Sequence, residues 1–187
     1  VLFIQHDVAD GIIAMLKGAL QQLHVGDPAW LSTDIGPVID DKALKNLQQH
    51  ADDMQDKATL LYQCPLPEQN SNGFFFAPLL YEIKDLSVLK REVFGPCVHV
   101  IRYKASELDK VIDQINGTGF GLTMGIHSRI EDRCNYLAKM SRAGNVYINR
   151  NMIGAIVGAQ PFGGRGLSGT GPKAGGPNYL LRLVKEK

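Results

Sequence analysis

The sequence predicts an α/β fold with a largely parallel, open sheet flanked by helices. Short apolar segments that suit strands alternate with longer segments in which apolar residues recur at helical spacing. The 187 residues are enough for one substantial core, and no internal repeat or low-complexity segment interrupts the order. Strands that alternate with helices are typical of parallel sheets, and such sheets bind ligands beyond the carboxyl ends of their strands.

The chain opens with an expected strand over residues 1–5 and a helix after it. Asp7 is placed to cap this helix, and Gly26-Asp27-Pro28 stops the chain from continuing it. The apolar positions of this segment recur with helical period at Ile12, Ile13, Leu16, Leu20 and Leu23.

A loop through residues 33–39 leads to a second, polar helix. This helix is expected to start at Asp40 or Asp41 and to run to about Lys57, with Leu44, Leu47, Ala51 and Met54 on one face. Two extended segments follow, at 59–63 and 74–81, with a loop over 65–72 between them.

The second half continues the alternation. Residues 97–103 alternate as a strand, and Ser106 is placed to cap a helix that carries Leu108, Val111, Ile112 and Ile115. A strand over 121–127 and a helix over 130–140 come next. A strand over 144–149 then enters a glycine-rich segment, and 179–184 is expected to be a last extended piece.

The charge balance excludes two classes of partner. The formal net charge is +1, so nothing favours nucleic acid or an acidic membrane surface. The longest apolar runs are far below the roughly 20 residues of a membrane span. Val1 starts within an apolar run, which suggests that the sequence is a piece of a longer protein.

Three scattered cysteines, Cys64, Cys97 and Cys134, suit reduced thiols in the cytoplasm better than a disulfide framework. None has a second cysteine or a histidine at zinc-ligand spacing, so no metal site is expected. Each could be a nucleophile only with a base or cation nearby. Cys97 alternates with His99 on one strand face; buried, inert thiols are the simpler interpretation for all three.

Residues 149–177 are rich in glycine and poor in charge. Ordering such a segment is entropically costly, and its main-chain N–H groups can approach an anion such as a carboxylate closely. Phe162 would supply an aromatic wall. Gly164 to Gly169 also match the spacing of a dinucleotide fingerprint, but that motif must open a helix, which Pro172 and the glycines after it prevent.

Glu92-Val93-Phe94-Gly95-Pro96 allows two interpretations. In one, Glu92 is an exposed side chain before a strand, Phe94 is a core residue and Gly95-Pro96 is a turn. In the other, the carboxylate of Glu92 accepts two hydroxyl hydrogen bonds, as from a ribose, beside the ring of Phe94.

Three motifs together resemble the aldehyde dehydrogenase superfamily: Thr33-Asp34-Ile35-Gly36-Pro37, Glu92 to Pro96, and Gln160-Pro161-Phe162-Gly163-Gly164 followed by Ser168-Gly169. Their order and spacing match over essentially the whole chain. The long segment ending in Pro172-Lys173-Ala174-Gly175-Gly176-Pro177 is similar to the L-glutamate γ-semialdehyde (1-pyrroline-5-carboxylate) dehydrogenases. The likeness is greatest to the dehydrogenase part of bacterial bifunctional proline utilization A.

The resemblance implies roles for five residues. Glu92 would bind the nicotinamide ribose of NAD, and Phe94 would lie against the nicotinamide. Gly154 and Ala155 would hold the α-carboxylate of L-glutamate γ-semialdehyde through their N–H groups, and Phe162 would pack on its aliphatic part. Ala155 stands where the family often has serine, so a main-chain contact survives there and a hydroxyl contact does not.

The resemblance also implies what these residues lack. A cysteine thiolate attacks the aldehyde in this family, and the resulting thiohemiacetal passes hydride to NAD. That cysteine, the general-base Glu, the oxyanion-hole Asn and the NAD-binding Rossmann half would lie upstream. Residues 1–187 would thus be a C-terminal part of the catalytic domain, with no catalytic residue of its own. Its anchor loop and glycine-rich segment would span about 150–177, and a C-terminal extension 178–187.

The complete enzyme would act in proline catabolism as a cytoplasmic homo-oligomer, and FAD would be needed only if a proline dehydrogenase domain precedes. Any peripheral contact with the inner membrane would come from other domains. The missing N-terminal half would be the main partner of this region; without it we expect an inactive, self-associating fragment. A non-catalytic binding or assembly module, or an aldehyde dehydrogenase for another substrate, remains an alternative.

Overall fold

The computed structural model describes residues 1–67, 73–156 and 158–185. It divides into two compact units, Val1–Glu107 and Leu108–Lys187. The α/β class with mostly parallel strand pairing is confirmed. The strands form one four-stranded and two two-stranded sheets in these residues, so the pairing is mixed where antiparallel strands join.

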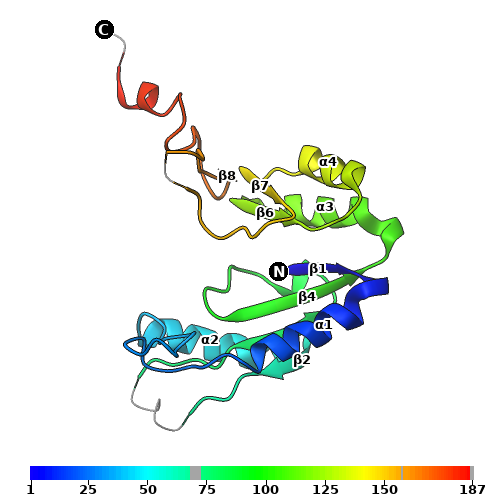
Figure 1. The fold of residues 1–187 in the computed structure, drawn as a ribbon, viewed down its shortest axis with the longest axis vertical. Helices are drawn as coiled ribbons and strands as arrows, with labels where there is room; N and C mark the ends of the chain where they lie inside the picture. The colour runs from blue at the N-terminus through cyan, green and yellow to red at the C-terminus, as the bar shows by residue number, and fades with distance from the viewer. Residues whose placement is uncertain (68–72, 157, 186–187) are drawn as a thin grey trace. The chain divides into compact units, whose positions relative to one another are not determined.

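The first unit is built on a four-stranded sheet in the order β1-β4-β3-β2 (Figure 1). Its strands are β1 (Leu2–Gln5), β2 (Ala58–Gln63), β3 (Leu79–Ile83) and β4 (Cys97–Tyr103). The pairs β1–β4 and β3–β4 are parallel, whereas β2 is antiparallel to β3. The central position of β3 and β4 explains why β3 and the middle of β4 are so apolar.

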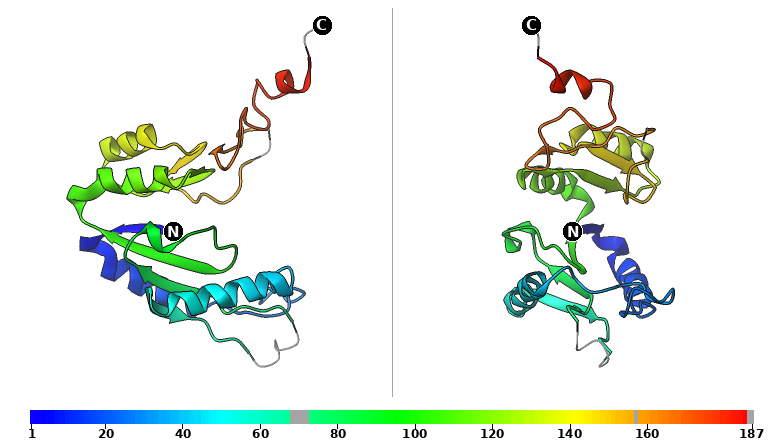
Figure 2. Two further views of the ribbon diagram at one scale, coloured as in Figure 1. Left: turned by 180° about the vertical axis from the view of Figure 1, so that it is seen from behind. Right: turned by 90° about the vertical axis from the view of Figure 1, so that its left-hand side faces the viewer.

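Two helices cover opposite faces of this sheet, α1 (His6–Leu20) and α2 (Asp41–Met54) (Figure 2). Alternation along β3 separates the two sides: Leu79, Tyr81 and Ile83 pack with the residues of α2, and Leu80 packs with those of α1. The sheet is therefore buried on both faces, as a parallel sheet requires.

Cap residues decide where these helices start. Asp40 is the N-cap of α2, and its Oδ1 accepts a hydrogen bond from the N–H of Ala43 at 2.7 Å, as the sequence predicts. The prediction for Asp7 is wrong. Gln5 is the N-cap of α1, and Asp7 lies within the first turn, where its carboxylate accepts from Gln5 Nε2 at 2.8 Å.

Three predicted segment ends in this unit are also wrong. Helix α1 ends at Leu20 instead of including Leu23, because the chain beyond it pairs elsewhere, with the N–H groups of Asp34 and Ile35 donating to the carbonyl of His24. Helix α2 ends at Met54 and not near Lys57. Strand β3 begins only at Leu79, since Pro78 has no N–H to offer a sheet. A short 3₁₀ turn, η2 (Leu86–Val88), follows β3.

The second unit contains α3 (Leu108–Gly117), α4 (Glu131–Met140) and four short strands. Strands β6 (Thr123–Ile126) and β7 (Asn145–Ile148) are parallel, and β5 (Phe120–Gly121) pairs antiparallel with β8 (Arg165–Gly166). Both helices pack on the same side of β6 and β7 (Figure 1). The small core there consists of Ile112, Ile126, Cys134 and Leu137.

Three predictions for the region after β4 need correction. Ser106 lies inside a 3₁₀ turn, η3 (Ala105–Glu107), and does not cap α3. The expected strand over 121–127 is split at Leu122 into β5 and β6, which pair with different partners. Residues 179–184 are not extended: η4 (Leu180–Leu183) is a 3₁₀ helix, because Tyr179 and Arg182 donate to carbonyls three residues back.

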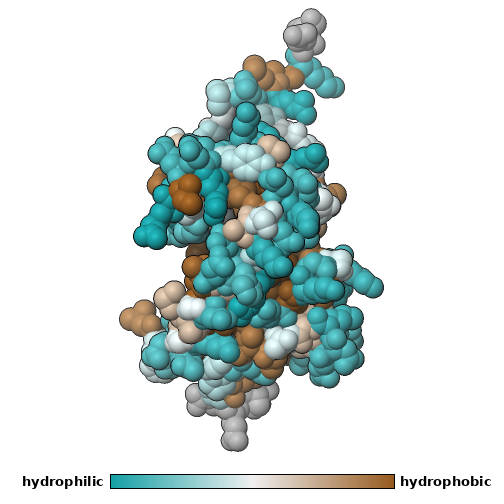
Figure 3. Space-filling model, turned by 90° about the vertical axis from the view of Figure 1, so that its right-hand side faces the viewer, coloured by the Kyte–Doolittle hydropathy of each residue, from teal (hydrophilic) through white to brown (hydrophobic). Residues whose placement is uncertain are grey.

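Apolar side chains are exposed along η4. Leu180, Leu181 and Leu183 are 72%, 67% and 68% exposed, and the hydrophobic surface near the end of the chain is visible at the top of Figure 3. Such a surface is typical of a contact region.

Every helix in the described part of the chain is too short or too polar to cross a lipid bilayer.

A buried histidine pair lies between α2 and the sheet of the first unit. His50 Nε2 and His99 Nε2 are 2.9 Å apart, and the ring of Tyr81 stacks on His99 with centroids 5.9 Å apart. Burial, then the charge of His50, lowers the pKa of His99 from 6.5 to about 4, and burial lowers the pKa of His50. Both rings are therefore held neutral in the folded chain.

This pair should make the first unit acid-sensitive. Between pH 6.5 and about 4 the unfolded chain binds protons that the folded pair cannot, so stability falls as the pH falls through that window. We expect a loss of about 1–3 kcal/mol in the free energy of unfolding, measured by urea denaturation at pH 7 and pH 4.5. His99→Gln should reduce this pH dependence. His127→Gln, which removes an exposed histidine of the second unit, should leave it intact; equal pH dependence in all three proteins would contradict the assignment.

Candidate functional site

The glycine-rich segment starts at a fixed corner after β7. Asn149 has a left-handed backbone with φ of 53°. Its side chain makes two hydrogen bonds to Ser128: Nδ2 donates to the Ser128 carbonyl at 2.9 Å, and Oδ1 accepts from the Ser128 N–H at 3.0 Å. Asparagine tolerates this conformation better than most residues, so the chain leaves the sheet in a defined direction.

Gly154 and Ala155, the predicted carboxylate anchor, lie on the exposed side of this segment. Gly154 has φ of 69° and is exposed, with no atom within 4 Å of where a Cβ would be. Neither its N–H nor that of Ala155 donates a hydrogen bond to another described residue. A turn directly after them is closed by Gln160, whose N–H donates to the Ile156 carbonyl and whose Oε1 accepts from the Ile156 N–H. Two adjacent free N–H groups in a held loop can bind a carboxylate.

Phe162, the predicted aromatic wall, is fixed through its main chain. Its N–H and carbonyl pair with Ala174 at 3.0 and 2.9 Å, which closes the loop between them. Asn145 on β7 holds the same stretch, because its Nδ2 donates to the Pro161 carbonyl and its Oδ1 accepts from the Gly163 N–H. The half-buried side chain of Phe162 is thus presented from a fixed backbone.

Several glycines here are required by packing and not by a ligand. A Cβ on Gly144 would collide with the carbonyl of Gly163, and one on Gly164 would lie 2.6 Å from Ser168 Cβ. The Ser168 hydroxyl in turn accepts a hydrogen bond from the N–H of Gly121 at 3.0 Å. These contacts bring main chain directly against main chain, which only glycine allows. Gly154 belongs to a different class, since positive φ and not crowding requires it.

Glu92 and Phe94 are both exposed, on a loop that enters β4 in the first unit. Phe94 is 84% exposed, so the interpretation of it as a core residue is wrong. The residue between them, Val93, packs on the core, and a Cβ on Gly95 would lie 2.5 Å from a methyl group of Leu47, which is buried. Val93 and Gly95 therefore fix the loop on the core, while Glu92 and Phe94 are exposed to solvent.

The carboxylate of Glu92 is available to a ligand. No hydrogen bond or ion pair of this group occurs among the described residues. An unpaired carboxylate next to an exposed ring suits a ribose hydroxyl pair and a flat heterocycle, so the residues present fit a nicotinamide nucleotide. Glu92 and Phe94 belong to the first unit, and Gly154, Ala155 and Phe162 belong to the second.

The cysteines lack the features of a nucleophile. Cys64 and Cys134 are buried, and their Sγ atoms lie 3.3 and 3.6 Å from the carbonyls of Leu20 and Ser128. Burial raises the pKa of Cys97 to about 11. His99 cannot serve it as a base, because its Nε2 is engaged with His50. All three are free thiols, and in the described residues no cluster of three His, Cys, Asp or Glu could hold a metal.

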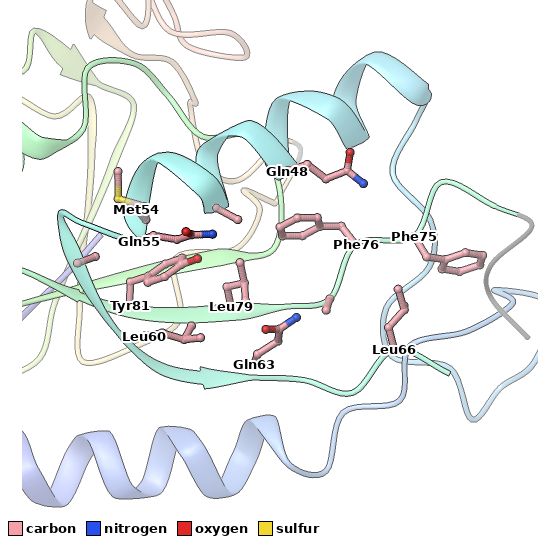
Figure 4. A pocket seen from close by; sticks show the side chains of 13 residues that line it. Gln48, Met54, Gln55, Leu60, Gln63, Leu66, Phe75, Phe76, Leu79 and Tyr81 are labelled. Atoms are coloured by element: carbon pink, nitrogen blue, oxygen red, sulfur yellow. The ribbon is translucent and has the colours of Figure 1, made fainter. Parts of the chain in front are cut away.

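A cavity of about 510 Å³ lies between α2 and the strands β2 and β3 of the first unit (Figure 4). Its lining is mainly apolar, with Gln48, Gln55 and Gln63 as the polar side chains around Phe76 and Leu79. None of the candidate residues and no charged side chain lines it, so it does not suit a small carboxylate.

Comparison with known proteins identifies the family of the chain. The sequence model of the aldehyde dehydrogenase family matches residues 1–187. The chain belongs to this family. It is 47% identical to the bifunctional protein PutA of Klebsiella aerogenes, over 100% of this chain and 15% of that protein. It is 36% identical to 1-pyrroline-5-carboxylate dehydrogenase of Geobacillus sp. (strain WCH70), over 98% of this chain and 35% of that enzyme.

The fold comparison gives the same result. A crystal structure of a mutant of Bradyrhizobium japonicum proline utilization A matches with a TM-score of 0.94 and 49% identity, covering 100% of this chain and 19% of that one. The resemblance drawn from the three sequence motifs is confirmed. The chain spans about a seventh of the length of the PutA proteins that it matches.

Two features near the candidate site are not predicted from the sequence. Asn145, in the strand expected over 144–149, makes hydrogen bonds to both Pro161 and Gly163. Tyr147 is the other: it is buried on β7, and the guanidinium of Arg150 lies 5.1 Å above its ring. An Asn at the first position of a strand that precedes a glycine-rich loop is a usable signal. Nothing in the sequence distinguishes Tyr147 from an ordinary core residue.

The packing role of Gly164 can be tested against a glycine that has space. Gly164→Ala should destabilise the loop by about 1–3 kcal/mol, because the methyl group meets the main chain of Ser168. Gly117→Ala, at the end of α3 with no atom within 4 Å of the new Cβ, should be neutral or slightly stabilising. Hydrogen–deuterium exchange of the paired Phe162 and Ala174 amides measures the effect. Unchanged protection in Gly164→Ala would show that the loop does not depend on this contact.

Proposed function

We propose that the protein containing this chain is a dehydrogenase that oxidises L-glutamate γ-semialdehyde to L-glutamate with NAD, as part of proline catabolism. The observation that carries the proposal is the pair of free N–H groups at Gly154 and Ala155 on an exposed loop. Membership of the aldehyde dehydrogenase family supports it. So does likeness to proteins named 1-pyrroline-5-carboxylate dehydrogenase and PutA.

Substrate selection follows from that loop. Gly154 and Ala155 donate to the α-carboxylate of the semialdehyde, and Phe162 packs on its methylene groups. No acidic residue occurs between Asn149 and Lys185, while Arg150, Arg165 and Lys173 lie in this stretch, so the local charge favours an anion. An aldehyde without a carboxylate gains nothing from these contacts, which argues against another aldehyde as the substrate.

Cofactor binding is proposed for Glu92 and Phe94. The Glu92 carboxylate accepts hydrogen bonds from the ribose hydroxyls next to nicotinamide, and the exposed ring of Phe94 contacts the nicotinamide side of the site. NAD, when bound, supplies the hydride acceptor. The support is the outward orientation of both side chains on a loop that Val93 and Gly95 hold in place.

The nucleophilic cysteine is proposed to lie outside these 187 residues, together with the rest of the NAD-binding half. The support is chemical: two of the three thiols here are buried against carbonyls, and the pKa of the third is about 11.

A non-catalytic module of the same fold is the alternative. A homo-oligomer in the cytoplasm is proposed on the exposed apolar residues of η4 and on the free thiols. FAD would be needed only where a proline dehydrogenase domain precedes.

A direct assay separates the enzyme from the non-catalytic module. The complete protein should reduce NAD when supplied with L-glutamate γ-semialdehyde, and propionaldehyde should be a far poorer substrate. The purified 187-residue chain should show no activity, because it lacks an activated thiolate. A complete protein that does not reduce NAD would support the non-catalytic alternative, and an active 187-residue chain would refute the placement of the nucleophile.

The anchor can be tested with two matched glycine variants. Gly154→Ala and Gly171→Ala both place a side chain at positive φ, 69° and 61°, where nothing lies within 4 Å. Each costs roughly 1–2 kcal/mol of backbone strain. Gly154→Ala should raise KM for the semialdehyde about five- to twentyfold, because the strain falls on the carboxylate anchor, whereas Gly171→Ala should leave KM within twofold. Equal effects on KM would argue against an anchor at Gly154.

A further inference from the structure

Tyr147 has an unusual environment at the base of the glycine-rich segment. Its side chain is 6% exposed, and its hydroxyl is the one buried side-chain polar atom without a hydrogen-bond partner in the described part of the chain. Buried hydroxyl groups normally find a partner. Because a phenylalanine would avoid the unpaired hydroxyl, the question is what the large ring at this position does.

The ring supports the first residues of the segment. Arg150, three residues further on, places its guanidinium carbon 5.1 Å from the centre of the Tyr147 ring. A cation over an aromatic face is attracted by the ring, and the planar guanidinium is well suited to this contact. The guanidinium of Arg150 is thus held against Tyr147 on β7, although Arg150 as a whole is exposed to solvent.

A second contact lies beside the first. Gly125 on β6 is the direct neighbour of Tyr147 across the parallel pair. The space that a side chain at Gly125 would fill is occupied by Met152, whose Sδ lies 3.1 Å from the position of that missing Cβ. Arg150 and Met152 therefore both contact neighbouring residues of β6 and β7, and both lie in the stretch that leads to Gly154.

We propose that Tyr147 is a positioning residue for the carboxylate anchor: its ring fixes Arg150 and, with Gly125, the path of residues 150–153, and so sets where the N–H groups of Gly154 and Ala155 lie. The proposal rests on the proposed function. Tyr147 itself does not touch the reacting atoms. Its proposed contribution comes from the ring, because the ring is the part of the side chain that contacts Arg150.

Steady-state kinetics of the complete protein test this assignment. Tyr147→Leu should raise KM for L-glutamate γ-semialdehyde about tenfold, with kcat and KM for NAD within twofold of wild type. Tyr147→Phe, which keeps the ring, should restore KM to within twofold. Tyr136→Leu is the matched control: it removes an exposed tyrosine of α4 whose hydroxyl donates to Asp109 at 2.8 Å, and it should leave KM unchanged.

Arg150→Ala gives an independent measurement at an exposed position outside the buried core. It should raise KM for the semialdehyde about threefold without changing kcat, and by more than Arg165→Ala, which removes a positive charge from the same segment. An equal rise in both variants would assign the effect to charge and not to the contact with Tyr147. If Tyr147→Leu does not fold, this variant decides alone, and an unchanged KM overturns the proposal. Tyr147→Phe and Tyr147→Leu with equal increases would also overturn it, since the hydroxyl would then be the active part. A wild-type protein without activity refutes the proposed function instead, so the two failures are distinguishable.

Discussion

Main-chain crowding around Gly163 and Gly164 is the constraint on which the second unit depends. The carbonyl of Gly163 lies against Gly144, and Gly164 lies against Ser168, with no room for a side chain at either glycine. The Ser168 hydroxyl then bonds to Gly121, so a segment far along the chain is attached to the β5 strand. Without this attachment, the residues that follow β7 would have few apolar contacts to order them.

This rigid part supports the exposed stretch in which the carboxylate anchor is proposed. Residues 162–174 are closed by the paired main chains of Phe162 and Ala174, and Asn149 fixes the exit from β7 with two hydrogen bonds. Between these two fixed points the chain has only to present Gly154 and Ala155 outward. A loop pinned at both ends loses less entropy when it binds a small ligand than a free loop does, which favours affinity.

Sequence patterns predicted the fold where one local rule dominated. Strand β4 has the predicted bounds because Cys97 to Tyr103 form one short segment without glycine or proline, and Asp40 caps α2 because its carboxylate accepts from a main-chain N–H three residues on. The prediction that Asp7 caps α1 was wrong because the helix starts earlier, with Gln5 as its N-cap. The prediction that residues 179–184 are extended was wrong because Leu180 to Leu183 suit a local 3₁₀ turn as well as a strand. The ends of α1 and β5 depended on pairing with distant segments, which local patterns do not contain.

The candidate site was predictable to a different degree. The resemblance placed Glu92, Phe94, Gly154, Ala155 and Phe162, and the structure adds that Glu92 and Phe94 are exposed and that Gly154 has positive φ. The sequence does not separate glycines required by packing, such as Gly144 and Gly164, from Gly154, the proposed anchor, since all look alike in a sequence. His50 and His99 are 49 positions apart, and only the packing of α2 on β4 brings their rings together.

The state of the three thiols has a consequence for covalent labelling. Alkylating reagents react with thiolates, and here Cys64 and Cys134 are shielded while Cys97 stays protonated far above neutral pH. Iodoacetamide at neutral pH should therefore leave this region unmodified. In the complete protein, rapid alkylation would mark an activated cysteine elsewhere, and peptide mapping would identify it without interference from these three residues.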